Sequence, residues 1–114
     1  MKCIVKYFER QHPPLLQLSI YDAPHRRMHV ATIQRYRDEL KEACAAAGIA
    51  IPISEPLDLS VIFVSPSSPD LDNLLTALYQ ALDGATLKGG GILVDDGLIS
   101  KATVSKFYPG PPKK

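Results

Sequence analysis

Long apolar runs are absent from this chain of 114 residues, and no stretch approaches the roughly 20 apolar residues that a membrane-spanning helix needs. Its first residues interleave Lys2, Lys6, Glu9 and Arg10 with apolar residues, whereas a signal peptide has an uninterrupted apolar segment. We therefore expect no membrane partner and no export. The expected location is cytoplasmic.

Cysteine is scarce as well, since Cys3 and Cys44 are the only two. Neither has a second cysteine or a histidine at the spacing of a metal-binding motif, which argues against a zinc site or a disulfide framework. The apolar fraction of 46% and the charged fraction of 22% are those of an ordinary globular protein. We expect a single domain over residues 1–114, in which 108–114 form a flexible basic tail.

Basic residues are nearly missing from the middle of the chain. From Glu55 to Asp96 there are seven acidic residues and a single base, Lys88. The net charge is +3 over residues 1–50 (eight bases, five acids), −6 over 51–100 (one base, seven acids) and +4 over 101–114 (four bases). Basic flanks around an acidic, metal-loaded centre would suit a polyanionic substrate. Solvated surfaces of opposite sign explain the same distribution equally well.

The first half of the chain predicts a hairpin followed by a helix. Strands are expected at Cys3–Phe8 and, after a proline break, at Leu15–Tyr21, where apolar residues recur at every second position. A helix is expected at Thr32–Ala47, because its apolar residues recur at three- and four-residue spacing, with Gly48 as its stop. This spacing places Arg37 among the charged residues of the solvent face.

The second half predicts strand, helix and strand. Leu57–Val64 reads as a central strand, and a helix is expected from about Asp72 to Asp83, with Asp72 as the candidate N-cap. A short strand is expected at Ile92–Val94 and a last strand at Ile99–Tyr108.

Four aspartates flank the second predicted helix: Asp70, Asp72, Asp95 and Asp96. Carboxylates that no base can pair must be solvated or neutralised, and a divalent cation commonly holds several together. If the helix and the strand after it run in opposite directions, the two pairs can meet and bind Mg²⁺. The other interpretation is that Asp72 caps a helix and that Asp95-Asp96-Gly97 forms a turn. Both stay open.

Several segments resemble the signature of the RusA family of Holliday junction resolvases, the crossover junction endodeoxyribonucleases. The resemblance is carried by Asp70-Leu71-Asp72-Asn73-Leu74, Ala81-Leu82-Asp83-Gly84, Val94-Asp95-Asp96-Gly97-Leu98-Ile99, Met28-His29-Val30 and Tyr36-Arg37-Asp38. It covers most of the chain, from about Leu18 to Phe107. It implies an α/β (α+β) fold, with two main helices packed on a small mixed sheet, and a homodimeric hydrolase. Such an endonuclease makes paired nicks in four-way DNA junctions during recombination and repair.

The resemblance also implies the roles of individual residues. Asp70, Asp72 and Asp96 would bind the Mg²⁺ ion, which Mn²⁺ could replace, and Asp95 would assist them in catalysis. Apart from the resemblance, the residues expected to contact DNA are Lys88, Lys101, Arg26, Arg27 and Asn73, with a solvated surface as the alternative for the basic ones.

Thr76 departs from the family pattern, which has a lysine four residues after the second aspartate of this motif. A neutral threonine cannot supply a charge to the scissile phosphate. Lys88 or Lys101 could replace that charge in an active enzyme. The alternative is a junction-binding protein of the same family that cuts weakly or not at all. A third hypothesis is an α/β interaction module without a nucleic-acid role.

Overall fold

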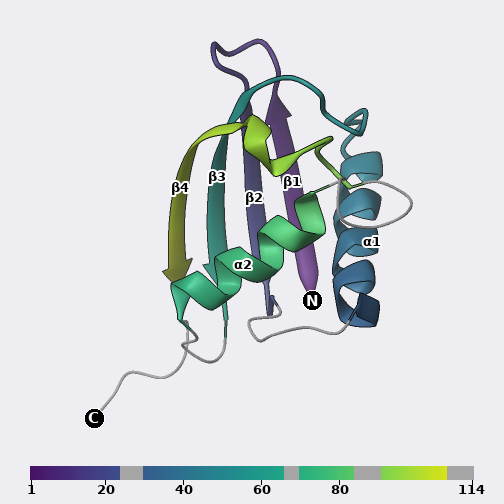
Figure 1. Ribbon diagram of the computed structural model, residues 1–114, viewed down its shortest axis with the longest axis vertical. Helices are drawn as coiled ribbons and strands as arrows, with labels where there is room; N and C mark the ends of the chain where they lie inside the picture. Colours follow the sequence, from purple (N-terminus) through teal and green to yellow (C-terminus); the bar gives the residue numbers. More distant parts are fainter. Residues whose placement is uncertain (24–29, 66–69, 84–90, 108–114) are drawn as a thin grey trace.

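The computed structural model describes residues 1–23, 30–65, 70–83 and 91–107. These residues form a four-stranded mixed sheet and two helices, as Figure 1 shows. The predicted α/β (α+β) fold, with two main helices on a small mixed sheet, is confirmed. The predictions for Arg26, Arg27, Lys88 and the tail 108–114 lie outside the described residues.

The sheet has the strand order β1-β2-β3-β4. Strands β1 (Lys2–Phe8) and β2 (Leu15–Tyr21) form the predicted antiparallel hairpin. Strand β3 (Leu57–Val64) runs parallel to β2, and β4 (Ile99–Phe107) runs parallel to β3. Parallel neighbours need a crossover connection between them, and each of the two helices lies in one such connection.

Helix α1 (Val30–Ala46) begins two residues before its predicted start at Thr32 and ends one residue before its predicted end at Ala47. Gly48 has a positive φ of 72°, and the amide of Ile49 donates a hydrogen bond of 2.9 Å to the carbonyl of Cys44. Glycine adopts this conformation without steric cost, so the chain turns sharply away from the helix axis.

Helix α2 (Leu71–Leu82) begins one residue before its predicted start. Its N-cap is Asp70, whose backbone is extended at φ −63° and ψ 138°, and Asp72 lies in the first turn. The prediction of Asp72 as the cap is therefore wrong. A helical φ and ψ at Asp72 exclude it from the cap position, which needs an extended backbone.

The predicted strand Ile92–Val94 does not form. Leu93 makes isolated bridges to Ile53 and to Asp83 instead. Its amide donates to the carbonyl of Leu82, at the end of α2, so its backbone groups are used outside the sheet. A short 3₁₀ helix, η1 (Asp96–Leu98), then leads into β4.

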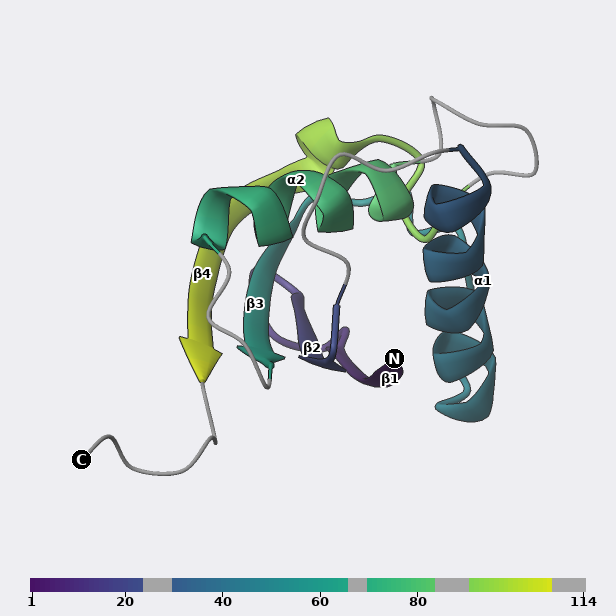
Figure 2. The ribbon, with the colours of Figure 1, turned by 90° about the horizontal axis from the view of Figure 1, so that it is seen from below.

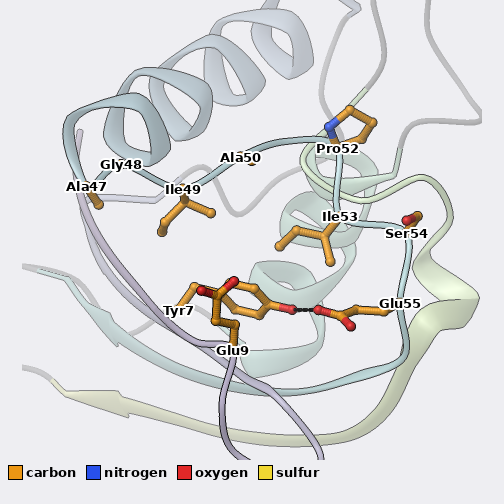
Figure 3. Close-up of a pocket in the computed structure, with 10 residues that line it drawn as sticks. All are labelled: Tyr7, Glu9, Ala47, Gly48, Ile49, Ala50, Pro52, Ile53, Ser54 and Glu55. Atoms are coloured by element: carbon orange, nitrogen blue, oxygen red, sulfur yellow. Dashed lines mark hydrogen bonds between the residues drawn. The ribbon is translucent and has the colours of Figure 1, made fainter.

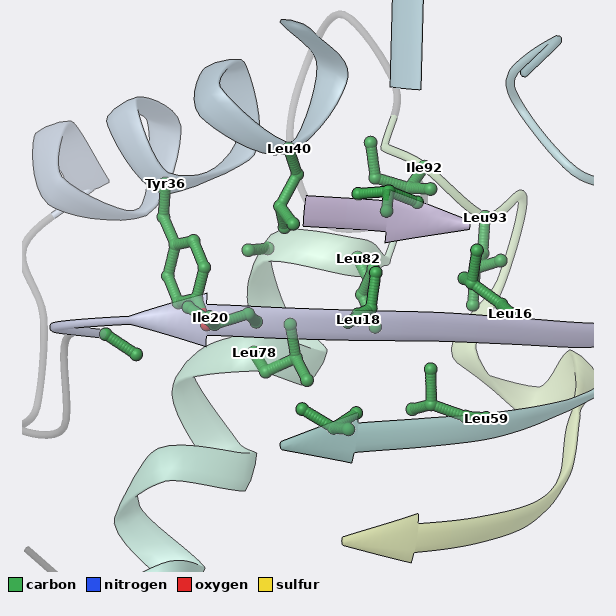
Figure 4. Close-up of a cluster of buried hydrophobic side chains, with 14 of the residues drawn as sticks. Leu16, Leu18, Ile20, Tyr36, Leu40, Leu59, Leu78, Leu82, Ile92 and Leu93 are labelled. Atoms are coloured by element: carbon green, nitrogen blue, oxygen red, sulfur yellow. The ribbon is translucent and has the colours of Figure 1, made fainter. Parts of the chain in front are cut away.

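The core lies between the sheet and the two helices, as Figure 4 shows. Side chains alternate along each strand, so one face of the sheet is apolar and buried. The largest apolar side chains that are fully buried are Tyr36, Phe63, Leu16, Leu18, Ile20, Leu40, Leu57, Leu59, Leu74, Leu78 and Leu82. Burial of one such side chain contributes about 1.5–3 kcal/mol, so this layer dominates the packing of α1 and α2 on the sheet.

Arg37 is fully buried, which contradicts its predicted place on the solvent face of α1. Its Nε donates to the carbonyl of Ala81 at 3.1 Å, and its Nη2 donates to the carbonyls of Gln80 (2.8 Å) and Asp83 (2.7 Å). The last carbonyls of a helix have no donor within the helix. Arg37 satisfies them at the end of α2 and so ties α1 to α2.

We predict that Arg37→Leu lowers the free energy of unfolding by about 3 kcal/mol or more, because buried carbonyls at the end of α2 lose their donors. Urea unfolding measures this loss. Arg35→Gln is the matched control on the same helix, since Arg35 is exposed, and it should change stability by less than about 0.5 kcal/mol. An Arg37→Leu protein as stable as the wild type would contradict the capping role.

Candidate metal centre

Residues 91–94, which follow the undescribed part of the connection from α2 to β4, lie against the end of α2. The amide of Leu93 donates to the carbonyl of Leu82 at 2.9 Å, and the amide of Val94 donates to the carbonyl of Ile53 at 3.0 Å. Gly91 makes this approach feasible, because a Cβ at that position would overlap the carbonyl oxygen of Leu82. These contacts bring the residues that follow Val94 close to the last turn of the helix.

Three carboxylates converge at this place. Asp83 is the C-cap of α2, Asp95 is the N-cap of η1, and Asp96 is the first residue of η1. Each offers an oxygen, and the three oxygens lie within 4.8 Å of one another. Asp83 is buried and Asp95 is exposed, so the cluster has a closed side towards α2 and an open side towards solvent.

The cluster combines three close carboxylates with one buried cation, Arg37, next to Asp83. The pKa of Asp96 is raised, first by desolvation, then by the charge of Asp83 and by the hydrogen bond and charge of Asp95. A backbone hydrogen bond from Gly97 opposes this shift. Carboxylates this close repel when they are ionised, and a proton or a cation between them relieves the repulsion.

The spacing can be compared with the geometry of divalent ions. Oxygens bound to one Mg²⁺ at about 2.1 Å lie no more than about 4.2 Å apart, and those around one Ca²⁺ lie up to about 5 Å apart. The oxygens lie within 4.8 Å of one another, a limit inside the range for Ca²⁺ and above that for Mg²⁺. Binding of Mg²⁺ would therefore draw the carboxylates closer together. Hard oxygen donors of this kind suit either ion.

The turn interpretation also receives support. Asp95 Oδ1 accepts a hydrogen bond of 2.8 Å from the amide of Gly97, and the carbonyl of Asp95 accepts one of 3.2 Å from the amide of Leu98. Asp95 thus shapes the start of η1 in the way aspartate often does at turns. A carboxylate has two oxygens with about four acceptor positions, so this role does not occupy the whole group.

Asp70 and Asp72 do not join this cluster. They lie at the first turn of α2, whereas Asp83 lies at its end, roughly 16–20 Å away along the helix axis. Because β3 and β4 are parallel, α2 must run back across the sheet between them. Its start therefore lies beyond the end of β3, while Asp95 and Asp96 lie before the start of β4, at the opposite edge of the sheet (Figure 1).

The remaining residues predicted for DNA contact or catalysis are dispersed. Asn73 and Thr76 are exposed on α2, and the Thr76 hydroxyl donates to the carbonyl of Asp72 at 2.9 Å. Lys101 on β4 is the register partner of Asp58 on β3, so it lies on the sheet face that points away from α2 and from Thr76.

Two residues of this region are not predicted from the sequence as parts of a site: Asp83 and Arg37. For Asp83 a signal exists, because the end of a crossover helix and the start of the next parallel strand lie at the same edge of a sheet. An aspartate at the helix end should then meet Asp95 and Asp96. For Arg37 the helical spacing gives no such signal.

A separate cavity of about 400 Å³ lies between β1, the end of α1 and the connection to β3, as Figure 3 shows. Tyr7 donates a hydrogen bond of 2.6 Å to Glu55 across it. Burial and this hydrogen bond raise the pKa of Tyr7. The charged residues that line this cavity are Glu9 and Glu55. Their negative charge repels phosphate, so the cavity does not suit a nucleic acid.

We predict that Asp96→Asn raises the melting temperature at neutral pH in the presence of a chelator. A raised carboxyl pKa means that the folded chain holds this proton more tightly than the unfolded chain does. Folding is therefore favoured while Asp96 is protonated, and stability falls as the pH rises through the aspartate range to above its raised pKa. The difference in melting temperature between Asp96→Asn and the wild type should vanish at acidic pH, where Asp96 itself is protonated.

Thermal unfolding over a pH series measures this effect. Asp72→Asn is the matched control, since a carboxylate in the first turn of α2 stabilises the helix, and its loss should slightly lower the melting temperature at neutral pH. If Asp96→Asn melts below the wild type across the whole pH series, repulsion within the cluster is not the dominant contribution of Asp96.

Comparisons with known proteins found no match. No family model matches the chain, and no curated protein or solved structure matches it either. Neither described helix is long and apolar enough to cross a membrane. A function for this chain therefore has to be inferred from its own residues, above all from the carboxylates of Asp83, Asp95 and Asp96.

Proposed function

We propose that this protein is a divalent-metal-dependent endonuclease that cuts four-way DNA junctions and works as a homodimer. The observation that carries the proposal is the convergence of Asp83, Asp95 and Asp96, whose oxygens lie within 4.8 Å of one another. The RusA-like motif segments supply the substrate class. This proposal keeps Asp95 and Asp96 of that motif and replaces Asp70 and Asp72 with Asp83.

Three carboxylates are suitable ligands for a divalent metal ion that catalyses phosphodiester hydrolysis. When bound, Mg²⁺ or Mn²⁺ would supply a Lewis acid for the scissile phosphate. Asp83 would hold the ion from the buried side, while Asp95 and Asp96 would hold it from the side open to solvent. Three carboxylates leave coordination positions for water and phosphate oxygens, which is the usual arrangement for Mg²⁺ in phosphoryl chemistry.

Arg37 would act as a positioning residue in this scheme. Its guanidinium binds the carbonyl of Asp83 at 2.7 Å, and the charge of Asp83 opposes the fall in the Arg37 pKa that burial causes. The buried cation therefore fixes the backbone that carries Asp83 and supplies one nearby positive charge. Arg37 itself is too buried to reach DNA.

A second candidate function is junction binding without efficient cleavage. The observation that favours it is the hydrogen bond of the Thr76 hydroxyl, which is made to the helix backbone and supplies no positive charge to a phosphate. The third candidate, an interaction module, is favoured by the hydrogen bond between Asp95 and Gly97. Cation binding and junction cleavage separate the three.

We predict that Mg²⁺ raises the melting temperature of the wild type and enables it to nick a synthetic four-way junction. Asp83→Asn should abolish both effects, with cleavage reduced by about 100-fold or more. Saturation of the site at about 100 times Kd would stabilise the fold by about 2.7 kcal/mol. Gel assays and thermal melts with and without chelator measure the two effects.

Asp70→Asn is the matched control for this experiment, because Asp70 lies at the other end of α2. It should keep the stabilisation by Mg²⁺. If Asp70→Asn loses that stabilisation while Asp83→Asn keeps it, the ion is bound at the start of α2 and the proposed centre is wrong. Junction binding without cleavage by the wild type would favour the second candidate, and neither binding nor a metal effect would favour the third.

We predict that the Thr76→Lys variant nicks the junction faster than the wild type, because the lysine supplies a positive charge that Thr76 lacks. Thr76 is exposed on α2, so lysine fits there without repacking. The measurement is the nicking rate in Mg²⁺, with Thr76→Gln as a control of similar length and no charge. Equal rates in both variants would show that charge at this position does not limit cleavage.

A further inference from the structure

One face of the sheet carries neither helix. Figure 2 shows α1 and α2 on the same side of the sheet, and every second residue of each strand points to the other side. The pairing registers align these outward residues in rows across the strands. We call this surface the open face. It spans roughly 14 Å across the strands and roughly 20 Å along them.

Exposed apolar side chains gather on the open face. Among the described residues, eight large apolar side chains are exposed, and five of them lie on this face: Ile4, Phe8, Tyr21, Ile62 and Phe107. Phe107 is 58% exposed, although it lies within a strand. Five exposed apolar side chains on one sheet face make this face a candidate binding surface.

The aromatic residues lie at both ends of the open face. Tyr21 and Phe107 belong to one row, two strands apart and so roughly 10 Å from each other. Phe8 lies in the row at the other end. Polar side chains, including Ser60 and Thr103, lie between these rows. The open face therefore has aromatic side chains in its two end rows and hydrogen-bonding side chains in the rows between them.

The charges of the open face are mainly positive. Lys2, Lys6 and Lys101 lie on it together with a single acid, Asp58. The Lys2 ammonium lies over the Tyr21 ring, 5.9 Å from its centroid, as a cation–π pair. A base that stacks on this side of the ring must displace the ammonium, which can then contact a phosphate.

We propose that the open face binds single-stranded nucleic acid, with bases stacked on its aromatic side chains and phosphates held by its lysines. Open four-stranded sheets with exposed aromatic residues stack two or three bases in other proteins. The three lysines complement a polyanion. This inference does not rest on the metal centre, which lies on the helix side of the sheet around Asp83.

A second copy of the chain is the less suitable occupant. Two such faces would bring their lysines together, and like charges oppose that contact. Interfaces of stable homodimers are also poor in lysine and serine, whereas the open face contains three lysines, and Ser19, Ser60 and Ser105 as well.

The test is a titration of labelled thymidine and uridine oligonucleotides, each about 12 nucleotides long, with the full-length protein in a buffer that contains a chelator. Fluorescence anisotropy measures the binding. The wild type should bind both, with log K falling by about 2 per decade of salt, since three lysines each neutralise one phosphate. Phe107→Ala should weaken binding at least about five-fold. Lys6→Gln should reduce the salt slope by about 0.7.

Matched controls lie on α1, away from the open face. Val30→Ala and Arg35→Gln alter an exposed apolar residue and an exposed cation, and both should bind as the wild type does. Binding in the presence of chelator, when the proposed metal centre holds no ion, separates this inference from the nuclease proposal. Thermal melts check that each variant is folded.

Three results would overturn the proposal. The first is no binding to either oligonucleotide at low salt. The second is binding that Phe107→Ala and Lys6→Gln leave unchanged. The third is a dimer in sedimentation experiments that Phe107→Ala dissociates, because the open face would then be the contact between two copies.

Discussion

The parallel pairing of β3 with β4 is the constraint on which the arrangement of the acidic residues depends. Two parallel strands must be joined by a segment that crosses back over the sheet, and α2 is that segment. The start and end of α2 consequently lie at opposite edges of the sheet. Asp83 meets Asp95 and Asp96 for this reason, and Asp70 and Asp72 face a different environment.

The end of α2 is held from two sides. Arg37 binds its last carbonyls from α1, and the segment after Gly91 binds the carbonyl of Leu82 from the connection to β4. The backbone that carries Asp83 is therefore held by donors from two other segments of the chain. A side chain on such a backbone loses little conformational entropy when it binds a ligand.

Much of the fold could be predicted from local patterns, because alternation in β2 and β3 and the helical spacing in α1 and α2 reflect burial that these residues do experience. The site could be predicted only in part. Asp95 and Asp96 are recognisable as an acidic pair, but their partner depends on strand direction, which periodicity does not encode. Arg37 resembles its charged neighbours in sequence, and only the end of α2 explains its burial.

The strand order leaves β4 at the border of the sheet, with β3 as its only described neighbour. A border strand has a row of backbone amides and carbonyls that another strand could extend, which is a route to aggregation. Charged side chains on such a strand obstruct that extension, and β4 contains Lys101 and Lys106. These lysines should therefore help to keep the protein dispersed at high concentration, whatever ligand the neighbouring surface binds.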